Sequence, residues 1–273
     1  MSNERLDAMP RAHRVEALQR GVNPRDVDVL LADLTGRSLA WVIGHGEERL
    51  DPSPLAALLA RRYAGEPLQY IRGKADFYSR EFLVDDRVLI PRPETELLVE
   101  AAIDRAPRSG RIVDIGTGSG CIAISIERER PDLHVLGVDF SIGALAVAAS
   151  NRTRLQSSVR FAASDIFAAV HGEFDVIVSN PPYIPQREIA TLQTEVRDHE
   201  PISALTPGPA GTEVIQRILD DARRVMRHDG LVIMEIGFGQ EALLRDLAAA
   251  KNYNVERFID DLAGIARVIV LSA

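Results

Sequence analysis

The sequence predicts an α/β protein with an open, mostly parallel sheet, preceded by a small helical domain. After residue 110, short apolar runs typical of buried strands alternate with amphipathic helical stretches. Such alternation indicates parallel strands joined by helical crossovers. Between residues 10 and 63, in contrast, apolar positions recur at helical spacing. These two patterns place a helical region first and the sheet second.

The strands and helices of the sheet region can be assigned in order. The strand-like runs are "RIVDI", "HVLGVD", "VRFAAS", "FDVIVS" and "GLVIMEI". A helix, "PRPETELLVEAAIDRA", with Pro93 near its start, precedes the first strand. The later helices are one from about Gly120, "SIGALAVAASNRTR", an amphipathic helix from Glu213 to Arg227, and one through Leu243 and Leu247. Only "DLAGI" separates the final runs, "NYNVERFID" and "ARVIVLSA". We therefore expect a terminal antiparallel hairpin beside the parallel strands.

The region before the sheet divides into two parts. Val27, Leu30 and Leu31 repeat at helical spacing, and Asn23-Pro24 is typical of a helix start. The later stretch "REFLVDDRVLI" predicts a hairpin with Asp85-Asp86 in its turn. We therefore expect a helical domain over residues 1–74, a β-hairpin linker over 75–92 and the sheet domain over 93–273.

Composition and charge restrict the function classes. The chain has 273 residues, 46% hydrophobic and 26% charged, which is ordinary for a globular protein. Its net charge of −8 argues against a general nucleic-acid-coating surface, and the single cysteine, Cys121, excludes an intrachain disulfide and fits a reducing compartment. The sequence shows neither a membrane-length apolar run nor a secretory signal. We therefore expect a soluble, cytoplasmic protein. We expect no bound metal, because the histidines are scattered along the sequence.

A glycine-rich loop follows the first strand of the sheet. In "VDIGTGSGCIAI" the glycines Gly116, Gly118 and Gly120 alternate with Thr117 and Ser119. A loop at this place in an open α/β sheet is where nucleotides bind, although a tight turn alone would also use glycine.

The acid ahead of the loop restricts the class of ligand that could bind there. Asp114 would repel a pyrophosphate but suits a cationic amino-acid group. S-adenosyl-L-methionine carries such a group together with a sulfonium. The spacing G-x-G-x-G, instead of G-x-G-x-x-G, also disfavours a dinucleotide.

Two further acids end the next strands. Asp139 can accept hydrogen bonds from both ribose hydroxyls of an adenosyl ligand, or it is a helix N-terminal carboxylate. Asp165 in "ASDIF" can accept from an adenine amino group, while Ile166 or Phe167 covers the ring. The alternative for this segment is a loop cap with a core aromatic.

The fourth strand runs out into "NPPY". Pro181 and Pro182 remove two backbone donors and hold the chain extended, which leaves carbonyls free to point into the crevice. The side-chain oxygen of Asn180 and a backbone carbonyl can then hold a planar NH2 group by both hydrogens, with Tyr183 packed on the flat substrate. Such a nitrogen is a poor nucleophile because its lone pair is delocalised. Holding it close to a methyl donor supplies much of the rate enhancement.

These motifs resemble a known family. "DIGTGSG", "VD", "SD" and "NPPY", in this order, resemble a class I, Rossmann-like S-adenosylmethionine-dependent methyltransferase acting on a planar NH2. "GEPLQYIRG", "VLIPRPETE", "HEPISAL" and "MEIGFGQ" further resemble the peptide-chain release factor glutamine methyltransferases, the HemK/PrmC family. The resemblance covers nearly the whole chain.

The resemblance implies an activity and its residues. The activity is methylation of the side-chain amide nitrogen of the glutamine in the Gly-Gly-Gln loop of class I release factors, with S-adenosyl-L-homocysteine as product. It implies that residues 116–120 bind the methionine part, Asp139 the ribose, and residues 180–183 the glutamine. It also implies that residues 92–96, beginning with Arg92, form part of the wall of the site. It further implies docking of the release factor by the helical domain. We expect a monomer that requires neither nucleic acid nor a membrane.

Three alternatives stay open. A ribosomal-protein glutamine methyltransferase would use the same clamp, although "PRPETE" resembles the release-factor branch more closely. An amino-methylating DNA or RNA enzyme would also use it, but would be expected to carry a basic recognition domain. A cofactor-binding assembly factor without activity would not need Asn180.

Overall fold

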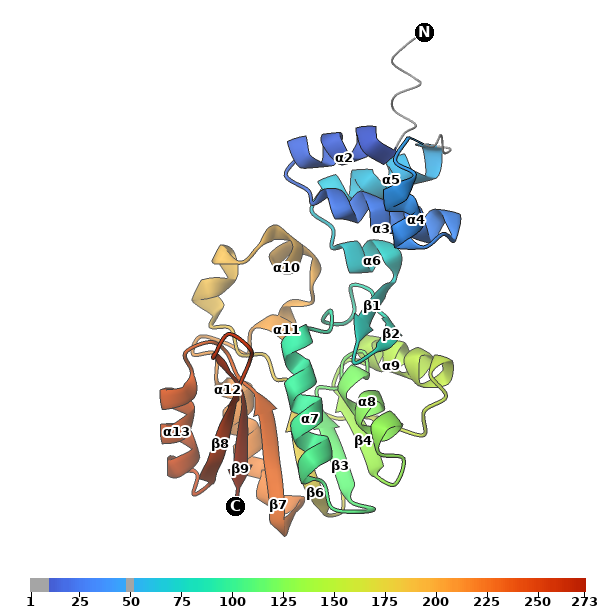
Figure 1. The fold of residues 1–273 in the computed structure, drawn as a ribbon. Helices are drawn as coiled ribbons and strands as arrows, with labels where there is room; N and C mark the ends of the chain where they lie inside the picture. Colours follow the sequence, from blue (N-terminus) through green and yellow to red (C-terminus); the bar gives the residue numbers. More distant parts are fainter. Residues whose placement is uncertain (1–9, 48–51) are drawn as a thin grey trace. The chain divides into compact units, whose positions relative to one another are not determined.

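The structure is a computed structural model that describes residues 10–47 and 52–273. The chain divides into two compact units (Figure 1). The N-terminal unit extends to Gly73 and includes residues 193–199, and the sheet unit comprises residues 74–192 and 200–273. The inclusion of residues 193–199 in the N-terminal unit was not anticipated from the sequence.

The N-terminal unit is helical. Its helices are α2 (Pro10–Gln19), α3 (Pro24–Thr35), α4 (Leu39–Gly44), α5 (Pro52–Tyr63), α6 (Leu68–Arg72) and α10 (Thr194–His199). Leu30, Leu31 and Leu55 lie in its core. The predicted start of α3 is confirmed, because the side chain of Asn23 accepts a hydrogen bond from Arg25 N at 3.0 Å.

One arginine joins three segments of this unit. Arg62 at the end of α5 pairs with Asp26 of α3 at 2.8 Å and with Glu195 of α10 at 3.1 Å. Both Arg62 and Asp26 are largely buried. The carboxylates of Asp26 and Glu195 both accept hydrogen bonds from the Arg62 guanidinium and balance its charge. This pairing explains why α10 belongs to the N-terminal unit.

The sheet unit contains a seven-stranded sheet. Its strands are β3 (Arg111–Ile115), β4 (His134–Asp139), β5 (Arg160–Ala163), β6 (Phe174–Ser179), β7 (Met226–Glu235), β8 (Asn254–Asp260) and β9 (Ala266–Ser272). The order is β5-β4-β3-β6-β7-β9-β8; β9 runs antiparallel to both β7 and β8, and the other adjacent pairs are parallel. The predicted fold class and terminal hairpin are confirmed, with β9 inserted between β7 and β8.

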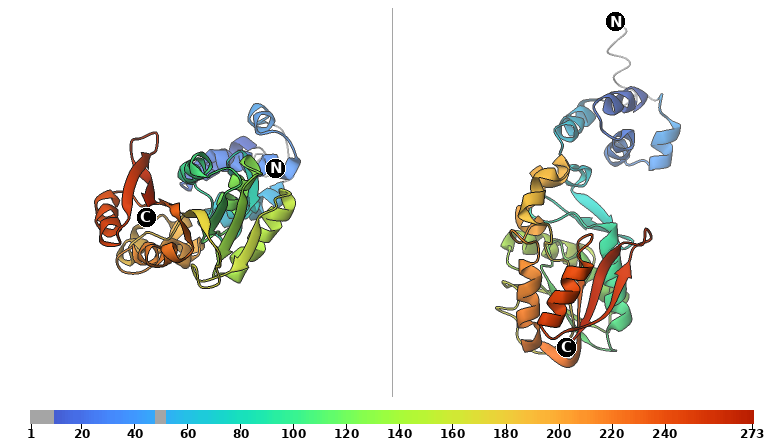
Figure 2. Two further views of the ribbon diagram at one scale, coloured as in Figure 1. Left: turned by 90° about the horizontal axis from the view of Figure 1, so that it is seen from below. Right: turned by 90° about the vertical axis from the view of Figure 1, so that its left-hand side faces the viewer.

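Helices cover both faces of the sheet (Figure 2). Helices α7 (Glu96–Arg105), α8 (Cys121–Glu129) and α9 (Ile142–Arg154) lie on one face, and α12 (Glu213–Asp221) and α13 (Glu241–Ala250) on the other. Short elements complete the unit. They are α11 (Ile202–Leu205), η1 (Pro93–Thr95), η2 (Gln186–Thr191) and η3 (Ala222–Arg224).

Helix α12 is shorter than predicted. It ends at Asp221 instead of Arg227, because the chain is already needed in the sheet: Met226 pairs with Phe174 of β6, and Phe174 N donates to Val225 O at 2.8 Å. The apolar residues that extended the helical pattern are buried at the sheet edge instead.

The hairpin before the sheet also differs from the prediction. It consists of β1 (Lys74–Phe77) and β2 (Arg80–Leu83), and its turn is Tyr78-Ser79, not Asp85-Asp86. Both turn residues have positive φ, 48° and 58°, as tight hairpin turns require. Phe77 and Phe82 are buried in the core beneath α7 and α8, so the hairpin is part of the sheet unit instead of a free linker.

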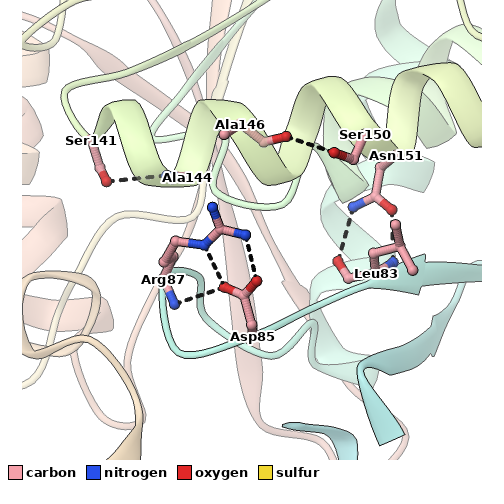
Figure 3. A network of polar contacts seen from close by, with 8 residues as sticks. All are labelled: Leu83, Asp85, Arg87, Ser141, Ala144, Ala146, Ser150 and Asn151. Atoms are coloured by element: carbon pink, nitrogen blue, oxygen red, sulfur yellow. Dashed lines mark hydrogen bonds and ion pairs between the residues drawn. The ribbon is translucent and has the colours of Figure 1, made fainter.

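Asn151 of α9 fixes the end of this hairpin, as Figure 3 shows. Its side chain accepts from Leu83 N at 2.7 Å and donates to Leu83 O at 3.0 Å and to Ser119 O at 2.9 Å. Asp85 instead binds the guanidinium of Arg87 after the hairpin. One buried amide therefore ties β2 to the glycine loop.

Candidate active site

The candidate site lies at the carboxyl edge of the sheet, where strand order reverses. Strand β3 has β4 on one side and β6 on the other, so the chains leaving β3 and β6 diverge and leave a crevice. Ser179 at the end of β6 donates to Ile115 O at the end of β3 at 2.8 Å, which joins the two strand ends. The glycine loop and "NPPY" therefore face the same crevice.

Two adjoining hollows occupy this crevice, of about 280 and 400 Å³. Residues that border both are Gly116, Asp139, Phe140, Pro182 and Ser203. Other predicted residues on their walls are Thr117, Gly118, Ser119, Asp165, Ile166, Asn180 and Pro181. Five predicted residues do not border these hollows. They are Asp114, Gly120, Phe167, Tyr183 and Arg92.

The glycine loop is held by backbone hydrogen bonds to the end of β4. Gly116 N and Thr117 N both donate to Val138 O at 2.9 Å. Gly116 has φ 72°, and a Cβ there would meet nothing within 4 Å, so the backbone conformation and not the space requires glycine. At Gly120 both matter, because a Cβ would come within 3.0 Å of Phe161.

Asp139 connects the loop to the next helix. Its Oδ2 accepts from Gly118 N and its Oδ1 from Ser141 N, both at 2.9 Å. Burial raises the pKa of this carboxyl, and backbone hydrogen bonds from Ser141, Gly118 and Phe140 oppose that effect. A carboxylate oxygen can accept more than one hydrogen bond, and Asp139 borders both hollows, so it can still accept from a ligand's hydroxyl groups.

Asp114 lies beneath the glycine loop, away from the hollow walls. It is fully buried, and its Oδ2 accepts from the Thr117 hydroxyl at 2.6 Å. Within the described residues its Oδ1 has no hydrogen-bond partner. Burial raises the pKa of Asp114 to about 7. Asp114 therefore lies behind the loop, where its interaction with a cationic ligand would be electrostatic and without direct contact.

Asp114 should make the stability of the free protein depend on pH. A carboxyl whose pKa is raised on folding, here from an unfolded value of ~3.9 to about 7, stabilises the fold fully only below the lower value. Stability is therefore lost as pH rises through this window, by on the order of 2–4 kcal/mol. In Asp114→Asn the melting temperature should fall less steeply between pH 5 and pH 8. Parallel melting curves for both proteins would contradict the burial of an unpaired carboxylate.

The far end of the site contains Asp165 and Ile166. Asp165 is exposed and pairs with Arg217 of α12 at 2.7 Å. Ile166 borders the larger hollow at an unusual φ of 50°, whereas Phe167 is fully buried in the core. Of the two predicted ring covers, the structure thus leaves Ile166.

Phe140 is a wall residue that the sequence reasoning missed. It follows Asp139, borders both hollows, and exposes 62% of its surface. A large exposed aromatic side chain beside a hollow is stronger evidence for ligand binding than a buried one, because packing of the core does not account for its position. The sequence signal was its position directly after the strand-ending acid.

Asn180 borders the smaller hollow, and one end of its carboxamide is hydrogen-bonded within the protein. Its Nδ2 donates to Thr95 Oγ1 at 3.2 Å. No described residue donates to its Oδ1. The acceptor oxygen is therefore available to a ligand, which is the arrangement that the clamp requires.

Tyr183 and Glu235 lie behind Asn180. The hydroxyl of Tyr183 donates to Glu235 Oε1 at 3.2 Å, and its carbonyl accepts from Gln240 at 3.0 Å. The packing of Tyr183 on the substrate stays a prediction. Thr95 donates to the other oxygen of Glu235 at 2.5 Å. Burial raises the pKa of Glu235 to about 7 and also raises the pKa of Tyr183. The resemblance placed Thr95 in the wall segment 92–96 without a specific role, and Glu235 was not identified as a site residue from the sequence.

Arg92 pairs with Glu200 near the smaller hollow. Glu200 is 5% exposed and also accepts from Ile90 N. Burial raises the pKa of Glu200, and Arg92 opposes this. Arg197, three positions earlier, pairs with exposed Asp198 at 2.7 Å. The pair therefore fixes the segment before α11, whose residues border the hollow.

The residues present fit an adenosyl methyl donor. The backbone at Gly116 is open, the carboxylate of Asp139 stands on the wall, and Phe140 offers an apolar face. Hollows of this size match the ~300–1,000 Å³ typical of small-molecule sites. Among residues 10–47 and 52–273, no three His, Cys, Asp or Glu side chains gather as metal ligands. In the same ranges, no helix is long and apolar enough to cross a bilayer.

Comparison with known proteins first defines the class. The methyltransferase small domain matches residues 93–198, and the PrmC N-terminal domain matches residues 12–73. A crystal structure of a methyltransferase from Pyrococcus furiosus has a TM-score of 0.54 at 19% identity, covering 80% of this chain and 97% of that one. The sheet unit therefore has a methyltransferase fold.

Curated relatives then define the family. The chain is 39% identical over 267 residues to the release factor glutamine methyltransferase of Gloeobacter violaceus, covering 94% of this chain and 93% of that protein. It is 42% identical over 216 residues to that of Koribacter versatilis, covering 78% and 76%. The chain belongs to the release factor glutamine methyltransferases, and the resemblance seen in the sequence is confirmed.

Proposed function

We propose that this protein transfers the methyl group of S-adenosyl-L-methionine to the side-chain amide nitrogen of the glutamine in the Gly-Gly-Gln loop of class I release factors. The observation that carries the proposal is the committed carboxamide of Asn180, with Nδ2 on Thr95 and Oδ1 available. Two relatives named release factor glutamine methyltransferase, at 39% and 42% identity, support the choice of substrate.

The bound cofactor supplies an electrophilic methyl group on a sulfonium. Asp139 would accept hydrogen bonds from the ribose, Phe140 and Ile166 would enclose the adenine, and the glycine loop would bind the methionine part. Asp114 contributes negative charge behind that loop. These residues bind and orient the cofactor.

Asn180 and a backbone carbonyl of the Pro181 segment hold the substrate NH2 by its two hydrogens. The nitrogen lone pair is then aimed at the methyl carbon, and the rate enhancement comes from positioning. A carbon–nitrogen bond forms as the carbon–sulfur bond breaks, and the nitrogen loses its surplus proton to water. Because that protonated amide is very acidic, no strong base is required.

The N-terminal unit is proposed as the docking domain for the release factor, and residues 74–92 as part of the sheet unit instead of a linker. We propose that the protein acts as a cytoplasmic monomer without nucleic acid. The ribosomal-protein alternative is disfavoured by the release-factor names of the relatives.

The test incubates the protein and methyl-labelled cofactor with four substrates in parallel. These are a class I release factor, the same factor with its loop glutamine changed to alanine, ribosomal proteins, and nucleic acid. We expect label on the intact release factor and none on the alanine variant. Label on ribosomal proteins or nucleic acid alone would reject the proposal.

A further inference from the structure

A chain of hydrogen bonds runs from the substrate side of Asn180 into the protein. It links the end of β6, the short helix η1 and the end of β7 through Asn180, Thr95 and Glu235. We propose that Thr95 and Glu235 are positioning residues that hold the carboxamide of Asn180 in one of its two orientations, with Oδ1 toward the substrate. This inference rests on the proposed function of Asn180.

The direction of each hydrogen bond follows from the donors available. An ionised Glu235 has no hydrogen to give, and Thr95 has a single hydroxyl hydrogen. Thr95 directs that hydrogen to Glu235 Oε2 at 2.5 Å, so its oxygen can only accept from Asn180. An amide's two ends are distinguished by such a network. The network therefore requires Nδ2 of Asn180 on Thr95 and Oδ1 in the hollow.

Burial makes this constraint strong. Thr95 is 2% exposed and Glu235 is 3% exposed, so bulk water does not readily replace either partner. A flipped Asn180 would set its oxygen against the lone pairs of Thr95 and its NH2 against the substrate NH2. Each mismatch leaves a buried polar group unpaired. A flipped carboxamide therefore cannot act as the clamp.

Glu235 is itself fixed from the other side. Its Oε1 accepts from Tyr183, whose carbonyl accepts from Gln240, and Gln240 in turn accepts from Gly237 N at 2.9 Å. These hydrogen bonds give Tyr183 a role in supporting Glu235. The "NPPY" corner and the loop after β7 are thereby joined into one support for Asn180.

The constraint holds only while Glu235 is ionised. Protonated Glu235 can donate to Thr95, which frees the Thr95 hydroxyl to donate to Asn180 Oδ1 and so permits the flip. Burial raises the pKa of Glu235 to about 7, opposed by its hydrogen bonds to Thr95 and Tyr183. Of the charged groups nearby, Glu94 raises this pKa and Arg267 lowers it. Methyl transfer should therefore increase as pH rises through about 7.

The kinetic test compares Thr95→Val with Thr95→Ser and Glu235→Gln, using single-turnover methylation of the release factor. Thr95→Val should lower the rate about 10- to 100-fold, with cofactor affinity within about twofold, and Thr95→Ser should restore most of the rate. Glu235→Gln should lower the rate and remove the increase near pH 7. As a matched control, Thr212→Val removes another buried hydroxyl, which accepts from Gln216, and should keep the wild-type rate.

A second readout does not depend on methyl transfer. The side-chain NH2 of Asn180 is observed by ¹⁵N NMR, assigned by its loss in Asn180→Ala. Its signal should shift with pH, with a midpoint near 7, and should stop doing so in Thr95→Val and Glu235→Gln. If no substrate is methylated but this titration is present, the inference stands and the proposed function fails. A wild-type rate in Thr95→Val, or an Asn180 signal that does not respond to pH, would overturn the inference.

Discussion

Asn180→Ala is expected to abolish methyl transfer, with a loss of about 10³-fold or more, while cofactor affinity stays within a few-fold. Asn180 offers the one side-chain acceptor identified for the substrate NH2, and positioning and preorganised polar groups each supply large factors in catalysis. The glycine loop and Asp139, which we propose as the cofactor-binding residues, make their hydrogen bonds to one another and to β4 and not to Asn180. Single-turnover rates and calorimetric titration of the cofactor measure the two effects separately.

The control for Asn180→Ala removes a side-chain amide elsewhere in the sheet unit. Gln216 of α12 donates to Thr212 at 2.9 Å, so Gln216→Ala loses a comparable hydrogen bond outside the site. It should leave both the rate and the cofactor affinity unchanged. If Asn180→Ala lowers the rate and the affinity equally, Asn180 is a structural residue and not part of a clamp.

The part of the site that could be predicted from sequence is the part built at strand ends. Gly116, Asp139 and Asn180 each follow a run that was recognisable as a strand, and parallel strands bring their carboxyl ends to one edge. Local pattern and topology together therefore placed these residues in one crevice. No long-range information was required.

The supporting residues could not be found in this way. Thr95 contacts Asn180, 85 positions away in the sequence, and Glu235, 140 positions away. Nothing in the local sequence around Thr95 or Glu235 distinguishes either residue. Their role comes from burial and from hydrogen-bond direction, which a sequence pattern does not encode. The resemblance placed Thr95 of "IPRPETE" in the wall segment 92–96 and gave Glu235 of "MEIGFGQ" no role, and it assigned neither of them to the support of Asn180.

Neighbouring positions were also hard to separate. Ile166 and Phe167 are adjacent and apolar, and only the backbone shows that the positive φ of Ile166 turns one toward the hollow and leaves the other in the core. Likewise, the hairpin turn was assigned to two aspartates, which commonly form turns, whereas cross-strand pairing places it at Tyr78-Ser79. In both cases tertiary packing overrode a local preference.

Asp139→Ala is expected to weaken cofactor binding about 100-fold or more, measured by titration with S-adenosyl-L-homocysteine. The substitution removes the proposed ribose acceptor and also the partner of Gly118 N, which fixes the loop. Asp139→Asn should bind nearly as poorly, because both oxygens of Asp139 accept backbone N–H groups, and an amide would present a donor to either Gly118 or Ser141. Unchanged affinity in Asp139→Ala would remove this residue from the site, whereas recovery in Asp139→Asn would show that charge and loop anchoring matter less than the ribose contact.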